Sequence, residues 1–113
     1  MSTEYFDAID EQIDALLHAT GLVWELENTG GGHDALKVYL NDDQTSFVML
    51  TCDASVVRVG RDSFACLGLY IDYDCGCDAS RMAYLNDESF SPLTLDQLVD
   101  FVAVTLQGWG VTA

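Results

Sequence analysis

Two cysteines and three aspartates lie within seven residues of each other, in the segment Asp72-Tyr-Asp-Cys-Gly-Cys-Asp78. Thiolate and imidazole groups are ligands that Zn²⁺ prefers, so Cys75 and Cys77, with His33 from another polar segment, form a candidate metal site. Closed zinc sites usually take four ligands from two C-x₂₋₄-C pairs, whereas this chain has a single C-x-C. A hairpin turn that bends at Gly76 explains the segment more simply, and metal binding is the alternative.

Neither nucleophilic nor phosphate chemistry has a recognisable arrangement of residues. The two histidines, His18 and His33, lie in no catalytic signature such as G-x-S-x-G. The run Gly30-Gly-Gly lacks the lysine and the following helix of a phosphate loop. Carboxylates are so numerous that no pair stands out as a general acid and base. We therefore predict that the chain is not an enzyme and needs no cofactor.

The charge balance narrows the classes of partner. The chain has 113 residues, 19 Asp and Glu against 4 Lys and Arg, a formal net charge of −15 and a hydrophobic fraction of 50%. That apolar fraction excludes an open acidic tail and suffices for the core of one domain, residues 1–113. So few cations cannot neutralise a run of phosphates, which argues against direct binding to nucleic acid or to an anionic membrane. Without a secretory leader or an apolar run of about 18 residues, we expect a cytoplasmic protein.

The first element available to position a site is a helix over residues 4–19, followed by Gly21. At about 100° per residue, one arc of this helix is apolar and carries Phe6, Ile9, Ile13, Leu16 and Leu17. The opposite arc carries carboxylates, with no basic residue before Lys37 to pair with them: Glu4, Asp7, Asp10, Glu11 and Asp14. Such a row is either a solvated face that keeps the protein in solution or a docking surface for a basic partner.

Short runs of β-forming residues, separated by turn residues, follow the helix. The first two alternate apolar with polar residues and are predicted to pair around a hairpin loop at residues 28–34. An antiparallel meander of five or six strands is the most economical arrangement. The strands are expected within residues 22–27, 35–40, 46–52, 55–59, 64–73 and 81–85.

A closing helix is predicted from Thr94 and Gln97, which have the spacing of a capping box, to about Gln107 before Gly108. Phe101 and Val104 lie outside its core arc, which consists of Leu95, Leu98, Val99, Val102 and Leu106. A helix that is apolar over most of its circumference must be covered on more than one side, by a curled sheet or by a second subunit. Phe101 and Val104 are therefore candidate core or dimer residues in an α+β domain whose helices flank one sheet.

The order of a leading amphipathic helix, a meander and a closing helix introduced by Pro92-Leu-Thr-Leu-Asp-Gln-Leu resembles the type III secretion chaperone-like fold. Proteins of that family are small acidic dimers that bind other proteins without catalysis, and the resemblance implies the same for this chain. It covers the element order and residues 93–106. Residues 41–63 have the pattern of strands and turns where the family has a middle helix, and no family binding residue transfers to this sequence.

These features together predict a non-enzymatic acidic module, homodimeric and cytoplasmic, that binds or inhibits a basic protein partner through the carboxylate row of the first helix. One form of this hypothesis is a DNA mimic of phage or mobile-element origin, in which carboxylates replace phosphates. The alternative is a thiol- or metal-binding protein built on the Cys75-Gly76-Cys77 turn and completed by Cys52, Cys66 or His33.

Overall fold

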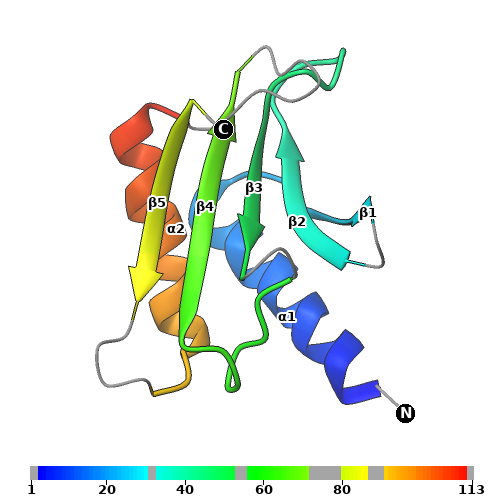
Figure 1. The fold of residues 1–113 in the computed structure, drawn as a ribbon, viewed down its shortest axis with the longest axis vertical. Helices are drawn as coiled ribbons and strands as arrows, with labels where there is room; N and C mark the ends of the chain where they lie inside the picture. Colours follow the sequence, from blue (N-terminus) through cyan, green and yellow to red (C-terminus); the bar gives the residue numbers. More distant parts are fainter. Residues whose placement is uncertain (1–2, 31–32, 53–55, 72–79, 87–90, 112–113) are drawn as a thin grey trace.

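A curved antiparallel sheet holds two helices on one of its faces (Figure 1). This computed structural model describes residues 3–30, 33–52, 56–71, 80–86 and 91–111, and for residues 3–8, 29, 30 and 33 it describes the backbone alone. The elements in chain order are α1 (Thr3–Thr20), β1 (Glu25–Gly30), β2 (His33–Tyr39), β3 (Phe47–Thr51), β4 (Phe64–Tyr70), β5 (Arg81–Asn86) and α2 (Leu95–Trp109).

The sheet is a simple meander. Its order is β1-β2-β3-β4-β5, and each strand pairs antiparallel with the next one in the chain. The predicted α+β class is therefore confirmed. The run at residues 55–59 was expected as a sixth strand, but its described residues, 56–59, form none. Val56 and Val57 are buried there, and the Val57 carbonyl accepts its hydrogen bond from the side chain of Gln12 in α1.

The core lies between the helices and one face of the sheet. Strand register places Leu36, Leu50 and Leu67 opposite one another, and all three are fully buried. Each such leucine contributes about 1.5–3 kcal/mol through burial. The helices contribute the buried side chains of Ile9, Leu16, Leu98, Val102 and Leu106 to the same cluster.

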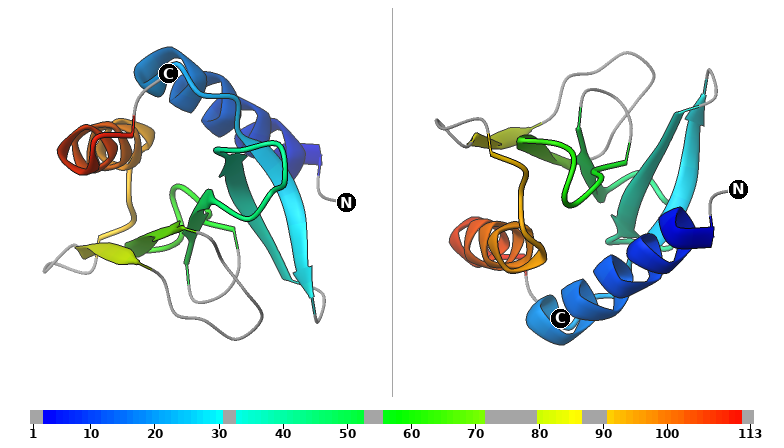
Figure 2. Two further views of the ribbon diagram at one scale, coloured as in Figure 1. Left: turned by 90° about the horizontal axis from the view of Figure 1, so that it is seen from above. Right: turned by 90° about the horizontal axis from the view of Figure 1, so that it is seen from below.

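The sheet curls around the helices. Figure 2 shows α2 lying along the β5 side while α1 reaches across toward β1 and β2. The two helices also pack against each other, so α2 is covered on more than one side. The curled sheet and α1 cover part of this over-apolar closing helix, and Val104 on it is 60% exposed.

The β1–β2 hairpin is longer than its sequence indicated. β1 begins at Glu25, later than predicted, and runs to Gly30, while β2 begins at His33. Most of the expected loop at residues 28–34 is therefore strand. The Asn28–Asp34 and Gly30–His33 pairs flank a shift in the register of the two strands.

Helix α2 begins as predicted and ends later. The backbone N–H of Gln97 donates to Thr94 Oγ1 at 3.1 Å, and the backbone N–H of Thr94 donates to Gln97 Oε1 at 2.9 Å, which completes the capping box. The helix continues through Gly108 to Trp109, and Gly110 ends it with φ of 77°. Gly108 was expected in that role, but the left-handed conformation that ends a helix is adopted by Gly110.

Candidate interaction surface

The five carboxylates predicted to form a row belong to the single helix α1, and we call them the acidic face: Glu4, Asp7, Asp10, Glu11 and Asp14. The side chains of Asp10, Glu11 and Asp14 are exposed, and those of Glu4 and Asp7 lie outside the described part of the structure. Ile9 and Leu16 are buried on the opposite side of the helix. Burial of that side turns the described carboxylates to solvent.

Gln12 fixes the rotation of α1, and the sequence pattern did not reveal it. The side chain is 1% exposed, and its Nε2 donates to the Val57 carbonyl at 2.8 Å. Among the described residues its Oε1 has no hydrogen-bond partner. The buried arc of α1 is therefore centred between Gln12 and Ile9, and Leu17, expected in the core, is 38% exposed. The helical angle of Gln12, next to that of Leu16, is the signal that identifies it in retrospect.

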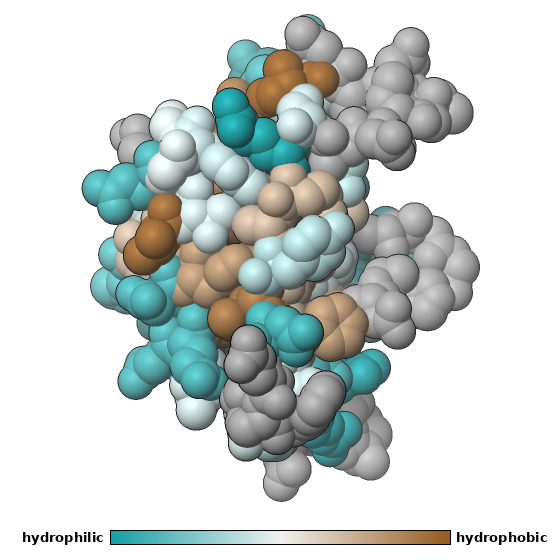
Figure 3. Space-filling model, turned by 60° about the vertical axis from the view of Figure 1, so that its left-hand side comes forward, coloured by the Kyte–Doolittle hydropathy of each residue, from teal (hydrophilic) through white to brown (hydrophobic). Residues whose placement is uncertain are grey.

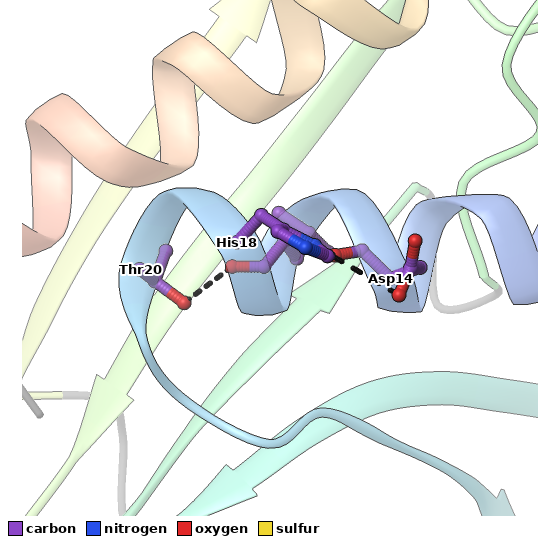
Figure 4. A network of polar contacts seen from close by, with 4 residues as sticks. Asp14, His18 and Thr20 are labelled. Carbon is purple, nitrogen blue, oxygen red and sulfur yellow. Dashed lines mark hydrogen bonds and ion pairs between the residues drawn. The ribbon is translucent and has the colours of Figure 1, made fainter.

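His18 is the one described basic group next to the acidic face. Its Nδ1 lies 2.8 Å from the Asp14 carbonyl oxygen and 3.8 Å from Asp14 Oδ1 (Figure 4). Both side chains are about three-quarters exposed, at 76% and 73%. Figure 4 also shows Thr20, whose hydroxyl donates to the Leu16 carbonyl at 2.6 Å as α1 ends. The imidazole thus neutralises Asp14 only when it is protonated.

No side-chain nitrogen of Lys or Arg within the described ranges lies within 4 Å of a described carboxylate. Lys37, the only lysine of the chain, points its Nζ at the Phe47 ring instead, 4.6 Å from the ring centroid. Such a contact over an aromatic face contributes about 0.5–1 kcal/mol at an exposed site. The described carboxylates of the acidic face therefore have no lysine or arginine partner.

Other exposed carboxylates are spread over separate elements. Asp42 and Asp43 lie in the β2–β3 turn, and Asp96 and Asp100 lie on the solvent side of α2. Asp62 has a local structural role, because its Oδ2 accepts the backbone N–H of Arg58 at 2.8 Å. Three exposed carboxylates within five residues, Asp10 to Asp14, make the acidic face the densest of these groups in the described chain.

The face of the sheet away from the helices carries a row of aromatic rings that sequence inspection did not find. Strand register places Tyr39, Phe47 and Tyr70 side by side. Phe47 and Tyr70 are stacked with centroids 4.7 Å apart, and Tyr39 meets Phe47 edge-on at 5.9 Å. The three residues lie on three strands, so only the strand register brings them together.

Tyr39 of β2 also links its side chain to β1, the edge strand of the sheet. Its hydroxyl donates to Glu27 Oε1 at 2.8 Å. Burial, followed by the hydrogen bond to Glu27 and the negative charges of Glu27 and Glu25, raises the pKa of Tyr39 to about 12. The phenol therefore keeps its proton, and its hydrogen bond to the carboxylate, beyond the pH at which an unfolded tyrosine ionises.

The thiol or metal alternative falls mostly on residues outside the described part of the structure. Cys75 and Cys77 belong there, as does the side chain of His33. Cys52 is buried in the core on the helix side of the sheet, whereas Cys66 pairs with Thr51 in register and faces the other side. These two thiols therefore cannot meet at one metal ion.

Cys66 is also a poor thiolate. Burial raises the pKa of the Cys66 thiol, and a hydrogen bond with Thr51 partly offsets that effect. A raised pKa disfavours the thiolate that binds a metal ion. The described residues contain no cluster of three or more side chains suited to hold one.

The two candidate dimer or core residues of α2 differ in their surroundings. Phe101 is half-buried and packs against the core, whereas Val104 is 60% exposed. Figure 3 turns the α2 and β5 side toward the viewer and shows brown and tan patches interrupted by teal. Among the large exposed apolar residues of the described chain, Val104 belongs to α2, and Met82 and Tyr84 belong to β5.

Comparisons of this chain with protein-family models, curated proteins and solved structures give no match. Within the described residues, no helix is long and apolar enough to cross a membrane. Because none of these comparisons gives a match, the resemblance to type III secretion chaperones depends on element order alone. Among the surfaces of the described chain, the acidic face is the densest in charge.

Proposed function

We propose that this chain is a non-enzymatic interaction module that binds a basic protein partner through the acidic face of α1. The observation that carries the proposal is the exposure of Asp10, Glu11 and Asp14 with no lysine or arginine within ion-pair distance among the described residues. Carboxylates at these spacings on one helix repel each other by a few tenths of a kcal/mol per pair. A basic surface would relieve that repulsion on binding.

The net charge of the whole chain also favours a basic partner. A formal charge of −15 attracts a basic protein from a distance and raises the association rate, an effect that weakens as salt screens the charges. The screening length is about 8 Å at physiological ionic strength. Binding through the acidic face should therefore weaken steeply as salt is added.

A DNA mimic is the most specific form of this proposal. The partner is then a nucleic-acid-binding protein, and the acidic face occupies part of its phosphate-binding surface. Duplex DNA and this chain should compete for such a partner, because its cations cannot pair with phosphates and carboxylates at once. A basic partner that binds this chain and duplex DNA together would remove the mimic and leave the general proposal in place.

The test is affinity capture of proteins from the source cells, with the immobilised wild-type chain compared with the triple variant Asp10→Asn, Glu11→Gln, Asp14→Asn. We expect a basic protein that the wild type retains at about 50 mM salt and releases at about 500 mM, where screening shortens to below 5 Å. The triple variant should retain at least tenfold less of it, which corresponds to about 1.4 kcal/mol of binding free energy.

The matched control removes the same number of charges elsewhere, through Asp42→Asn, Asp96→Asn and Asp100→Asn, all at exposed positions. This control should retain the partner with less than a threefold loss. Equal losses in the two triple variants would mean that only total charge matters and would overturn the assignment to α1. A capture that yields no salt-sensitive basic protein would leave the acidic face as a solvated surface.

A further inference from the structure

The two edges of the sheet are built differently. The β1 edge carries two carboxylates: Glu25 is exposed, and Glu27 accepts a hydrogen bond from the Tyr39 hydroxyl. The pairing of β1 with β2 also contains a shift in register. Charged side chains and register shifts are the devices that keep an edge strand from pairing with another chain. The β1 edge is thus protected by its own residues.

The β5 edge, residues Arg81–Asn86, has none of these carboxylates. Its register with β4 is continuous over all six residues, and β4 is its only neighbour in the described sheet. Met82 and Tyr84 point to the face away from the helices and are 41% and 68% exposed. An edge that is regular, partly apolar and free of acid is a template for pairing with a further strand.

Charge decides which strand can pair there. A strand rich in acid would be repelled by the net charge of −15, and a strand rich in base would find Arg81 and no carboxylate on β5. A second copy of β5 brings no carboxylate to the contact, because its six residues carry one cation and no anion, and the repulsion that remains comes from the rest of each chain. On this strongly acidic chain, the β5 edge is the strand edge at which two copies meet with the least repulsion.

We propose that two copies of this chain associate through antiparallel pairing of their β5 edges, which joins the two sheets into one. Antiparallel pairing around a two-fold axis is self-complementary, so each copy supplies the same donors and acceptors to the other. It also brings the exposed Met82 and Tyr84 of each copy beside those of the other, on the face away from the helices. The acidic faces of α1 take no part in this contact.

Salt should strengthen this association. Each copy carries a charge of −15, so added salt screens the repulsion between copies, while main-chain pairing and apolar contact lose little. Binding of a basic partner to the acidic face has the opposite salt dependence. Dimer formation and partner binding can therefore fail or succeed independently in the same preparation.

Sedimentation velocity of the full chain, from about 10 µM to about 1 mM at low and high salt, tests the proposal, since small interfaces associate weakly. We expect a monomer–dimer equilibrium whose dissociation constant falls as salt rises. A monomer throughout this range, or a dimer that dissociates as salt is added, would overturn the proposal.

Two variants that add the same charge locate the interface. Tyr84→Asp places a carboxylate on the β5 edge, and Val104→Asp places one on the exposed side of α2, at a residue 60% exposed. Tyr84→Asp should raise the dimer dissociation constant at least tenfold, and Val104→Asp should change it less than threefold. The reverse result would move the interface to α2 and contradict the proposal, provided that urea denaturation shows both variants folded.

Hydrogen exchange of the wild type gives a readout that needs no variant. Amides of residues 81–86 should exchange more slowly as protein concentration rises, whereas those of residues 25–28 in β1 should not change. Concentration-dependent protection confined to α2, or equal in both edges, would contradict pairing through β5.

Discussion

The acidic face of α1 and the β5 edge offer opposite kinds of binding. The acidic face presents charged side chains on a helix whose backbone is already hydrogen-bonded, so its attraction acts over distance and does not require an exact fit. The β5 edge presents a regular backbone with almost no charge, so it can bind only a strand that lies directly against it. The difference suggests how one acidic chain can attract a basic partner and still approach its own copy.

The largest expected effect comes from weakening the packing of α1 against the sheet. Leu16 is fully buried, and Leu16→Ala should lower the free energy of unfolding by about 2–5 kcal/mol, because it leaves a cavity between α1 and the sheet. The adjacent control Leu17→Ala, at a residue 38% exposed, should cost less than about 1 kcal/mol. Urea denaturation measures both values, and equal losses would contradict the observed rotation of α1.

A second substitution tests where the exposed acidic face of α1 ends and its buried side begins. Gln12→Glu puts a carboxylate where the amide is 1% exposed and should destabilise the fold at pH 7 by about 2–4 kcal/mol. The folded-state pKa of this carboxyl is raised, so the loss relative to wild type is small below about pH 4 and grows as pH rises toward that pKa. Ala19→Glu adds the same charge at an exposed position and should change stability by less than about 0.5 kcal/mol at either pH.

The sign of the salt dependence tests the contrast between the two regions directly. Raising salt from about 50 to 500 mM should weaken capture of the basic partner about tenfold and strengthen self-association by a smaller factor. Both are measured on one preparation, by capture and by sedimentation. Salt effects of the same sign would contradict this contrast between the two regions.

The smallest expected effect concerns the protected β1 edge. Tyr39 has its pKa raised from 10.0 to about 12, so between these values the folded chain holds a proton that the unfolded chain has lost. Its contribution to stability is complete below pH 10 and is lost as pH rises toward 12. Tyr39→Phe should cost about 1 kcal/mol or less at pH 7. The variant should also lose less stability than wild type between pH 9 and pH 11.5 in urea denaturation.

Local signals in the sequence predicted the framework correctly. The α+β class, the capping box at Thr94 and Gln97, and the end of α1 before Gly21 each depend on residues close together in the chain. The outward direction of Asp10, Glu11 and Asp14 follows from helical periodicity, which is also local. These features could be inferred because no distant contact is needed to create them.

The features that sequence reasoning missed depend on distant contacts. The buried amide of Gln12 donates to the carbonyl of Val57, 45 residues away, and this contact links α1 to a buried run that is not a strand. The aromatic row of Tyr39, Phe47 and Tyr70 needs the register of three strands. Gly108 and Gly110 are equivalent in sequence, and only the backbone angle of Gly110 distinguishes the one that ends α2.

The packing of α1 against α2 sets an order of events during synthesis. These helices come from opposite ends of the described chain, and all five strands are made between them. Strands that pair with their sequence neighbours can form as they emerge, but the face of the sheet that α2 covers stays open until the last helix is complete. The nascent chain therefore exposes core leucines for longer than its simple meander suggests, and an arrest of translation before residue 95 would leave a species prone to aggregate.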